Sequence, residues 1–117
     1  MTAAELTSRH CSPCKKGDPA LTALQASEMM DALHADWTLG TDKTSIIRQC
    51  KFSNYYETIA FVNALAWIAH REDHHPDLEV GYNRCVIHFS THSIGGLSDN
   101  DFICAAKIDA LLQTADQ

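Results

Sequence analysis

The sequence lacks the features of a membrane-spanning or nucleic-acid-binding protein. No apolar run approaches the roughly 20 residues that a membrane-spanning helix needs. Lys and Arg together number 9 against 15 Asp and Glu, so the formal net charge is −6. No cluster of basic residues is available to contact a phosphate backbone. We therefore expect neither a direct nucleic-acid partner nor a membrane partner.

A disulfide framework and a signal peptide are also missing. The 5 cysteines are odd in number, and three of them fall within expected helices or strands. This usage favours free thiols in a reducing compartment. Residues 1–5 have no basic start followed by an apolar block, which a signal peptide would show. We therefore expect a cytoplasmic protein.

Length and composition indicate a single domain. The chain has 117 residues, of which 45% are hydrophobic, enough for a genuine core. Residues 1–19 form a polar lead segment, in which Pro13, Gly17 and Pro19 interrupt any regular pattern. We expect this lead segment to be partly ordered at best, and the domain to cover residues 20–117.

Hydrophobic periodicity predicts three helices in the domain. The first begins at Thr22, because Thr22-x-x-Gln25 has the spacing of a capping box. The second follows Ser53 or Asn54 and runs to about residue 72, and the third begins at residue 98. The residues expected to face the core are Leu24, Met29 and Leu33 in the first helix, Ile59, Val62, Leu65, Ala66 and Ala69 in the second, and Phe102, Ala105, Ile108 and Leu112 in the third.

Four strands are expected at residues 37–39, 45–52, 78–82 and 84–91. Short turns join the first strand to the second and the third to the fourth, so each pair should be antiparallel. The predicted fold class is α+β, with a four-stranded antiparallel sheet and helices packed on one face as a two-layer sandwich. Such an open sheet leaves an edge or a face bare, which oligomerisation would cover.

Histidines gather near two of the expected element boundaries. His74 and His75 follow the second helix, and His92 follows the fourth strand. A helix end and a strand end can meet at the same edge of a layered fold, so we expect these three side chains around one shallow cleft. Imidazole has a reference pKa of about 6.5 and can donate or accept a proton near neutral pH. Several such groups around one pocket favour a reaction made of proton transfers.

Each of these residues also has a structural interpretation. Histidines at a helix C-terminus can simply complement the helix dipole, although three of them beside Pro76 and a glycine pair favour a site. His70 is expected to be a solvated or hydrogen-bonding residue. Ser98-x-x-Asp101 is an N-cap pattern, so capping is the first role expected for Asp101. The same carboxylate can orient an imidazole, and the two roles are compatible.

Two patterns raise the question of a metal. His70 and His74 have the i, i+4 spacing of metal ligands on one helix face, provided that the helix persists that far. The intervening residues do not form the H-E-x-x-H motif of zinc proteases. Cys11-x2-Cys14 is half of a zinc or redox motif without a second pair. We expect no metal and no cofactor, and keep a metal-dependent hydrolase built on His70, His74 and His92 as a weaker alternative.

From about Leu21 to Leu112 the sequence resembles the pterin-4a-carbinolamine dehydratase family. The residues that carry the resemblance at the family spacing are His70, His74, His75, Pro76, Tyr82, His92 and Asp101, together with Trp37, Asp73, Ser90-Thr91-His92 and Gly96-Leu97-Ser98. His70 stands where the family often has Glu, so a carboxylate role cannot be carried over to that position. The lead segment lies outside the shared core, and the resemblance assigns it no chemistry.

The resemblance implies a dehydratase that converts a 4a-hydroxytetrahydropterin into a quinonoid dihydropterin and water. This reaction would recycle the pterin cofactor of aromatic amino acid hydroxylases, and such a hydroxylase becomes a candidate partner. The implied catalytic residues are His74, His75 and His92, and the implied substrate-binding residues are Pro76, Thr91, Ser93 and Asp101. Homodimers or homotetramers are typical of the family. The alternative is a non-enzymatic role of the same fold, as a dimerisation or transcriptional cofactor or as an assembly factor.

Overall fold

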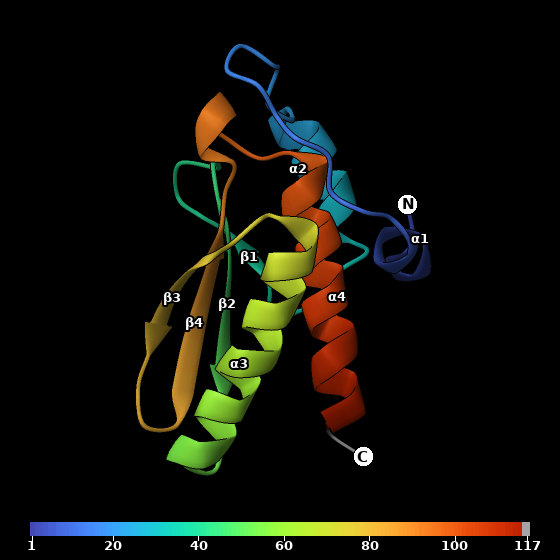
Figure 1. Ribbon diagram of the computed structural model, residues 1–117. Helices are drawn as coiled ribbons and strands as arrows, with labels where there is room; N and C mark the ends of the chain where they lie inside the picture. The colour runs from blue at the N-terminus through green and yellow to red at the C-terminus, as the bar shows by residue number, and fades with distance from the viewer. Residues whose placement is uncertain (116–117) are drawn as a thin grey trace.

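The computed structural model describes residues 1–115 of the chain. Figure 1 shows a sheet with the long helices gathered on one of its faces. In chain order the elements are α1 (Ala3–Ser8), α2 (Ala23–Met30), β1 (Thr38–Leu39), β2 (Ile46–Lys51), α3 (Tyr55–Glu72), β3 (Asp77–Val80), β4 (Arg84–Phe89), the 3-10 helix η1 (His92–Ile94) and α4 (Asp99–Ala115). In the part of the chain thus described, no helix is both long and apolar enough to cross a bilayer.

The strands form one sheet in the order β1-β2-β4-β3, and every neighbouring pair is antiparallel. The register places Ile46 opposite Phe89 and Cys50 opposite Cys85. These four side chains are buried, so they lie on the face that the helices cover. The predicted α+β sandwich with a four-stranded antiparallel sheet is confirmed. The strands β3 and β4 end two residues earlier than expected, at Val80 and Phe89.

Side chains fix the helix starts as the sequence predicts. Thr22 and Gln25 form a complete capping box at the start of α2. Asn54 is the N-cap residue of α3, where its side chain accepts a hydrogen bond from the amide of Glu57. Both helices therefore begin where a short polar side chain satisfies an amide that has no partner within the helix.

The core surrounds α4, in which five consecutive residues from Phe102 to Ala106 are at most 2% exposed. A helix buried on all sides must be covered by more than one neighbour. Two of the expected core faces differ from the structure. Leu24 is 70% exposed, because the short helix α2 buries Ala26 instead. In α3, Ala66 is exposed, and the buried residues of the inner face are Thr58, Phe61, Leu65 and Glu72.

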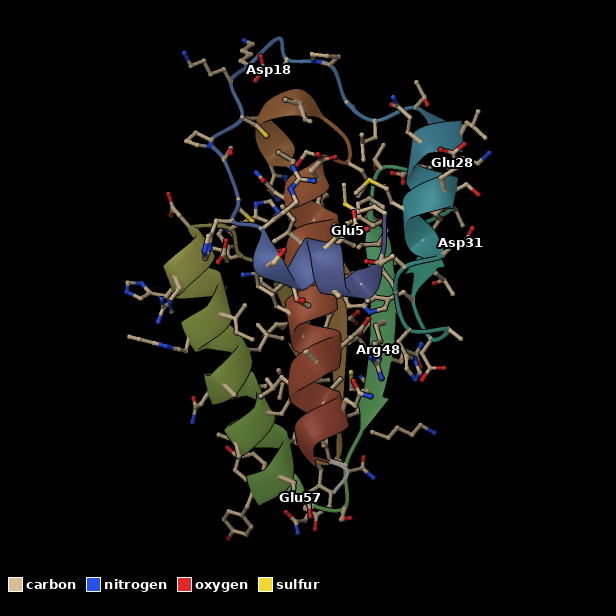
Figure 2. The ribbon with its side chains drawn as sticks, turned by 90° about the vertical axis from the view of Figure 1, so that its right-hand side faces the viewer. Glu5, Asp18, Glu28, Asp31, Arg48 and Glu57 are labelled. Atoms are coloured by element: carbon tan, nitrogen blue, oxygen red, sulfur yellow. The ribbon has the colours of Figure 1, made fainter. Side chains whose placement is uncertain are left out.

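The lead segment contains a helix and packs against the domain. Figure 2 shows α1 lying across α4, on the side of α4 that faces away from the sheet. Leu6 of α1 is fully buried in the common core. Thr2 caps α1 by accepting a hydrogen bond from the amide of Glu5. The sequence suggested at best partial order here, because a six-residue helix has no periodicity to reveal it.

Candidate active site

His74 is positioned by the way α3 ends. Asp73 adopts the left-handed conformation, with φ 52° and ψ 43°, and so turns the chain sharply after Glu72. The amides of Asp73 and His74 donate back to the carbonyl oxygens of His70 and Ala69, at 3.3 and 3.1 Å. His74 therefore lies just beyond the helix, and its backbone helps to cap it.

The imidazole of His74 is held between an aromatic ring and a buried carboxylate. Its ring stacks on Phe89 with centroids 5.7 Å apart and an interplanar angle of 9°. Its Nε2 lies 2.6 Å from Oδ1 of Asp101, which is fully buried. The other oxygen of Asp101 accepts hydrogen bonds from Thr91 Oγ1 at 2.9 Å and from the Ser98 amide at 3.0 Å. Asp101 thus performs both roles considered for it, capping α4 and orienting an imidazole.

This contact selects one tautomer of neutral His74. An ionised carboxylate can only accept hydrogen bonds, so Nε2 carries the proton and Nδ1 has the free electron pair. His74 can therefore act as a base whose protonated form has a buried counter-charge.

The loop after β4 presents His92. An isolated bridge between Thr91 and Gly96 closes this loop, with the Thr91 amide donating to the Gly96 carbonyl at 2.8 Å. Between them the chain makes the single turn of η1 and reverses at Gly95, whose φ of 65° suits a residue without a Cβ atom. His92 and Ser93 are exposed on this turn.

The three predicted histidines line one cleft of about 530 Å³. His74 and His75 come from the segment after α3, and His92 comes from η1. The cleft also contains the predicted residues Thr91 and Ser93, together with Ser90, Arg71, Glu72, Asp73, Asn100 and the segment Cys11–Cys14. A volume of this size falls in the range of small-ligand sites.

Three other predicted residues lie elsewhere. Pro76 and Asp101 do not line the cleft. Pro76 shapes the chain between His75 and β3, and its carbonyl lies 3.3 Å from the Nδ1 of His75. His70 is exposed, with its ring 5.4 Å from that of Trp67. The i, i+4 relation with His74 does not arise, because α3 ends at Glu72.

Two buried polar residues of the site were not singled out in the sequence. Glu72 accepts hydrogen bonds from the Cys11 amide at 2.7 Å and from His10 Nδ1 at 3.0 Å, and it pairs with Lys107 at 3.2 Å. Asn100 bonds to the backbone of Ser12. A glutamate in the last turn of a helix opposes the helix dipole, and this was the available signal that Glu72 has specific partners.

Glu72 is ionised over the whole physiological range. Burial raises the pKa of its carboxyl group, but the hydrogen bonds from Cys11, His10 and Lys107 and the charge of Lys107 outweigh burial and lower the pKa to about 2. Its side chain is 5% exposed. The cleft therefore contains a fixed negative charge that is already neutralised by its own partners.

Among residues 1–115 no metal cluster is found, and one further hollow, of about 410 Å³, is lined by a single histidine, His10. No group of three or more His, Cys, Asp or Glu side chains in that range is arranged to hold a metal ion. A larger hollow of about 880 Å³ runs along β2 near Arg48 and Lys51, but no histidine lines it. The three predicted histidines therefore share the cleft of about 530 Å³ and line neither of these other hollows.

The fold and the cleft define a class of small α+β protein with three histidines around one cleft. The family model described as Pterin 4 alpha carbinolamine dehydratase matches residues 19–111. The chain belongs to the pterin-4a-carbinolamine dehydratase family, and homology assigns it to the enzymes of that family.

Relatives and solved structures agree with this assignment. A protein of Nitrosomonas europaea named "Putative pterin-4-alpha-carbinolamine dehydratase" is 52% identical over 110 residues, which cover 94% of this chain and 96% of that protein. A protein of the same name from Legionella pneumophila (strain Corby) is 53% identical over 108 residues, covering 92% and 96%. The crystal structure of a transcriptional coactivator/pterin dehydratase from Brucella melitensis matches with a TM-score of 0.75 and 30% identity, covering 79% of this chain and 97% of that one.

A further solved structure carries a different functional description. It is described as a pterin dehydratase-like protein identified as a RuBisCO assembly factor in the alpha-carboxysome. It matches with a TM-score of 0.58 and 25% identity, and covers 67% of this chain and 90% of its own. The fold is thus found in proteins described by more than one role.

Proposed function

We propose that this protein dehydrates a 4a-hydroxytetrahydropterin to a quinonoid dihydropterin by general acid–base catalysis, and so recycles the pterin cofactor of aromatic amino acid hydroxylases. The observation that carries the proposal is the convergence of His74, His75 and His92 on one cleft. These residues come from two segments that are distant in the sequence, so a shared structural role for all three is a weaker explanation.

The reaction needs only proton transfers. The hydroxyl group on C4a must gain a proton to leave as water, and N5 must lose its proton as the double bond forms. One neutral and one protonated imidazole on the two sides of the ring can perform both steps. Each positioned acid or base typically contributes about 10²–10⁴-fold, which suits an intermediate that also dehydrates unaided.

The contacts of the three histidines support different roles. His74 has the Asp101 carboxylate behind it, so it is the better group to take the proton from N5. His92 is exposed on the opposite segment of the cleft and is assigned to protonate the leaving hydroxyl group. His75 is assigned mainly to binding and polarising the pterin.

The proposed substrate-binding residues also have different roles, some in direct contact with the pterin and some acting indirectly. Ser93 is exposed in the cleft, where its hydroxyl group can bond to the heteroatoms of a pterin. The hydroxyl group of Thr91 already bonds to Asp101 and lies 2.8 Å from Ser98 Oγ, so we assign Thr91 to the wall of the cleft. Pro76 and Asp101 act indirectly, by setting the chain direction after His75 and the orientation of His74.

The test is carbinolamine turnover by the purified protein, generated in place by a pterin-dependent hydroxylase. The wild type should accelerate the disappearance of the carbinolamine, and replacing His74 or His92 by Ala should lower kcat at least about tenfold. His74→Gln is a companion variant that retains a donor for Asp101 and so protects the fold. The matched control is His70→Ala, which removes an exposed imidazole outside the cleft. Unchanged turnover in both the His74 and His92 variants would reject the proposed roles.

A second candidate is a binding role without catalysis, as a transcriptional cofactor or an assembly factor. Two matched structures, one of a transcriptional coactivator/pterin dehydratase and one of a RuBisCO assembly factor, support this second candidate. Such a role would use the outer surface, so a specific partner should be retained equally well after His74 and His92 are replaced. We also propose that the chain forms a homodimer or homotetramer. A light-scattering mass near the 13.0 kDa of one chain would contradict this.

A further inference from the structure

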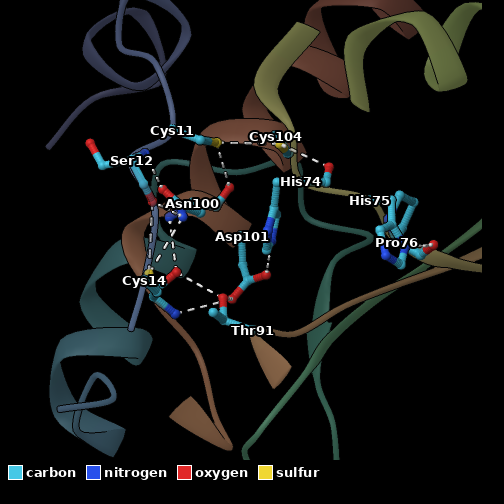
Figure 3. A network of polar contacts seen from close by, with 11 residues as sticks. Cys11, Ser12, Cys14, His74, His75, Pro76, Thr91, Asn100, Asp101 and Cys104 are labelled. Atoms are coloured by element: carbon cyan, nitrogen blue, oxygen red, sulfur yellow. Dashed lines mark hydrogen bonds and ion pairs between the residues drawn. The ribbon is translucent and has the colours of Figure 1, made fainter. Parts of the chain in front are cut away.

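One wall of the cleft comes from outside the matched family core. The family model covers residues 19–111. Cys11, Ser12, Pro13 and Cys14 precede that range, yet they line the same cleft as the histidines. In Figure 3, Cys11, Ser12 and Cys14 lie on one side of His74, and His75 and Pro76 lie on the other. The lead segment thus has a place in the site that neither the family resemblance nor the chemistry of the histidines assigns.

Asn100 fastens this wall by a pair of hydrogen bonds to one residue. Its Oδ1 accepts from the Ser12 amide at 3.0 Å, and its Nδ2 donates to the Ser12 carbonyl oxygen at 2.7 Å (Figure 3). Nδ2 also lies 3.5 Å from the thiol of Cys14. Asn100 is only 8% exposed. The side chain therefore uses both its acceptor and its donor group on the lead segment, as a neighbouring strand would.

Glu72 holds the other end of the wall. Its buried carboxylate accepts from the Cys11 amide at 2.7 Å, while Lys107 of α4 supplies the compensating charge. The Cys11 thiol adds a contact of 3.6 Å with the thiol of Cys104. If the lead segment moved away, the buried side chains of Glu72 and Asn100 would lose these hydrogen-bond partners. Leaving buried polar groups unpaired costs folding free energy. The wall is therefore held in one position.

We propose that residues 11–14 form a substrate-positioning wall of the cleft, and that Asn100 is the positioning residue that sets it. The inference rests on the proposed dehydratase activity at this cleft. The imidazoles that move protons belong to the two other segments, so the wall acts on how tightly the pterin is held and not on the proton transfers. A pterin ring that is enclosed on a further side loses more of its surrounding water and has less freedom of orientation.

The first test separates binding from chemistry in Asn100→Ala. The KM for the carbinolamine should rise on the order of tenfold, the effect of one or two lost hydrogen bonds, while kcat stays within about twofold. Asp99→Asn is the matched control, because Asp99 pairs with Arg9 of the same lead segment at 3.2 Å but does not line the cleft. Its KM should match that of the wild type.

A second readout reports on the wall itself. The amides of Cys11 and Ser12 donate to Glu72 and Asn100, so their hydrogen exchange should be slow in the wild type and fast at Ser12 in Asn100→Ala. Adding a stable 7,8-dihydropterin should slow the exchange of both amides further in the wild type. Ser12→Pro is the second variant, because it removes the same bond at an exposed position and leaves Asn100 intact.

The two readouts distinguish the possible outcomes. A raised KM with unchanged exchange at Ser12 would mean that Asn100 contacts the pterin directly, and it would overturn the proposal. Fast exchange with an unchanged KM would overturn it as well. If the wild type shows no dehydratase turnover, the proposed function fails, and the wall is tested by titration of the dihydropterin alone. In that case, equal dihydropterin affinity in the wild type, Asn100→Ala and Ser12→Pro would overturn the inference.

Discussion

The buried carboxylate of Glu72 should make the stability of the protein depend on pH in the acid range. Its pKa is about 2 in the folded chain, against a reference value of 4.5. A folded-state pKa below the unfolded one stabilises the fold at any pH above the unfolded value, and this stabilisation is lost as the pH falls toward the folded value. The difference corresponds to roughly 3 kcal/mol, fully present at pH 7.

Urea denaturation of the wild type and Glu72→Gln at fixed protein concentration measures this contribution. Other carboxyl groups titrate in the same range, so the useful quantity is the difference in unfolding free energy between the two proteins. At pH 3 about two fifths of the stabilisation remains, so this difference should shrink by about 2 kcal/mol between pH 7 and pH 3. Glu28→Gln, at an exposed position of α2, is the control for removing one negative charge.

A difference that stays constant from pH 7 to pH 3 would refute the reasoning, because it would mean that Glu72 has the same pKa in the folded and unfolded chains. The hydrogen bonds from the lead segment would then not be stabilising the ionised form. A difference that shrinks equally in the Glu28 control would point to overall charge as the cause.

Three further predictions follow from the packing of the site. Asp101→Asn keeps the shape but removes the charge behind His74, so kcat should fall about 10–100-fold with little change in KM; a kcat equal to that of the wild type would exclude the orienting role. Leu6→Ala should lower the unfolding free energy by about 2–5 kcal/mol, as measured in urea, whereas a negligible loss would show that α1 is not docked. The oxidant diamide should join Cys11 to Cys104 with the loss of two hydrogen atoms, because their sulfur atoms are 3.6 Å apart, and peptide mass mapping that finds both thiols unmodified would contradict this contact.

The parts of the fold that local chemistry determines could be predicted from the sequence. The capping box at Thr22 and the N-cap at Asn54 depend on residues three apart, so the sequence alone located both helix starts. The cleft itself was predicted because His74 and His92 each follow the end of an element. The fold class followed from the order of those elements.

The remaining features depend on contacts between distant parts of the chain. Leu6 is fully buried although α1 has no apolar stripe, since the outer side of α4 offers it a partner. Glu72 looks solvated in sequence, and its burial is explained by its contacts with the lead segment and with Lys107. For Asp101 the sequence predicted capping, orientation of an imidazole or substrate binding, and only the folded chain shows its full burial and its contact with His74. Hydrophobic periodicity is a local pattern, so it cannot predict contacts between residues that are far apart in the sequence.

The double use of Asp101 affects how sequences of this type should be interpreted. The carboxylate is needed to start α4 whether or not any reaction takes place. A related protein that had lost catalytic activity and kept only a binding role would still need Asp101, together with Ser98 and Thr91. His75 and His92 are exposed and do not support the core, so they would be free to drift. Under the proposed function, that exposed pair is therefore the better diagnostic of a working enzyme, because Asp101 would be retained for the start of α4 in either case.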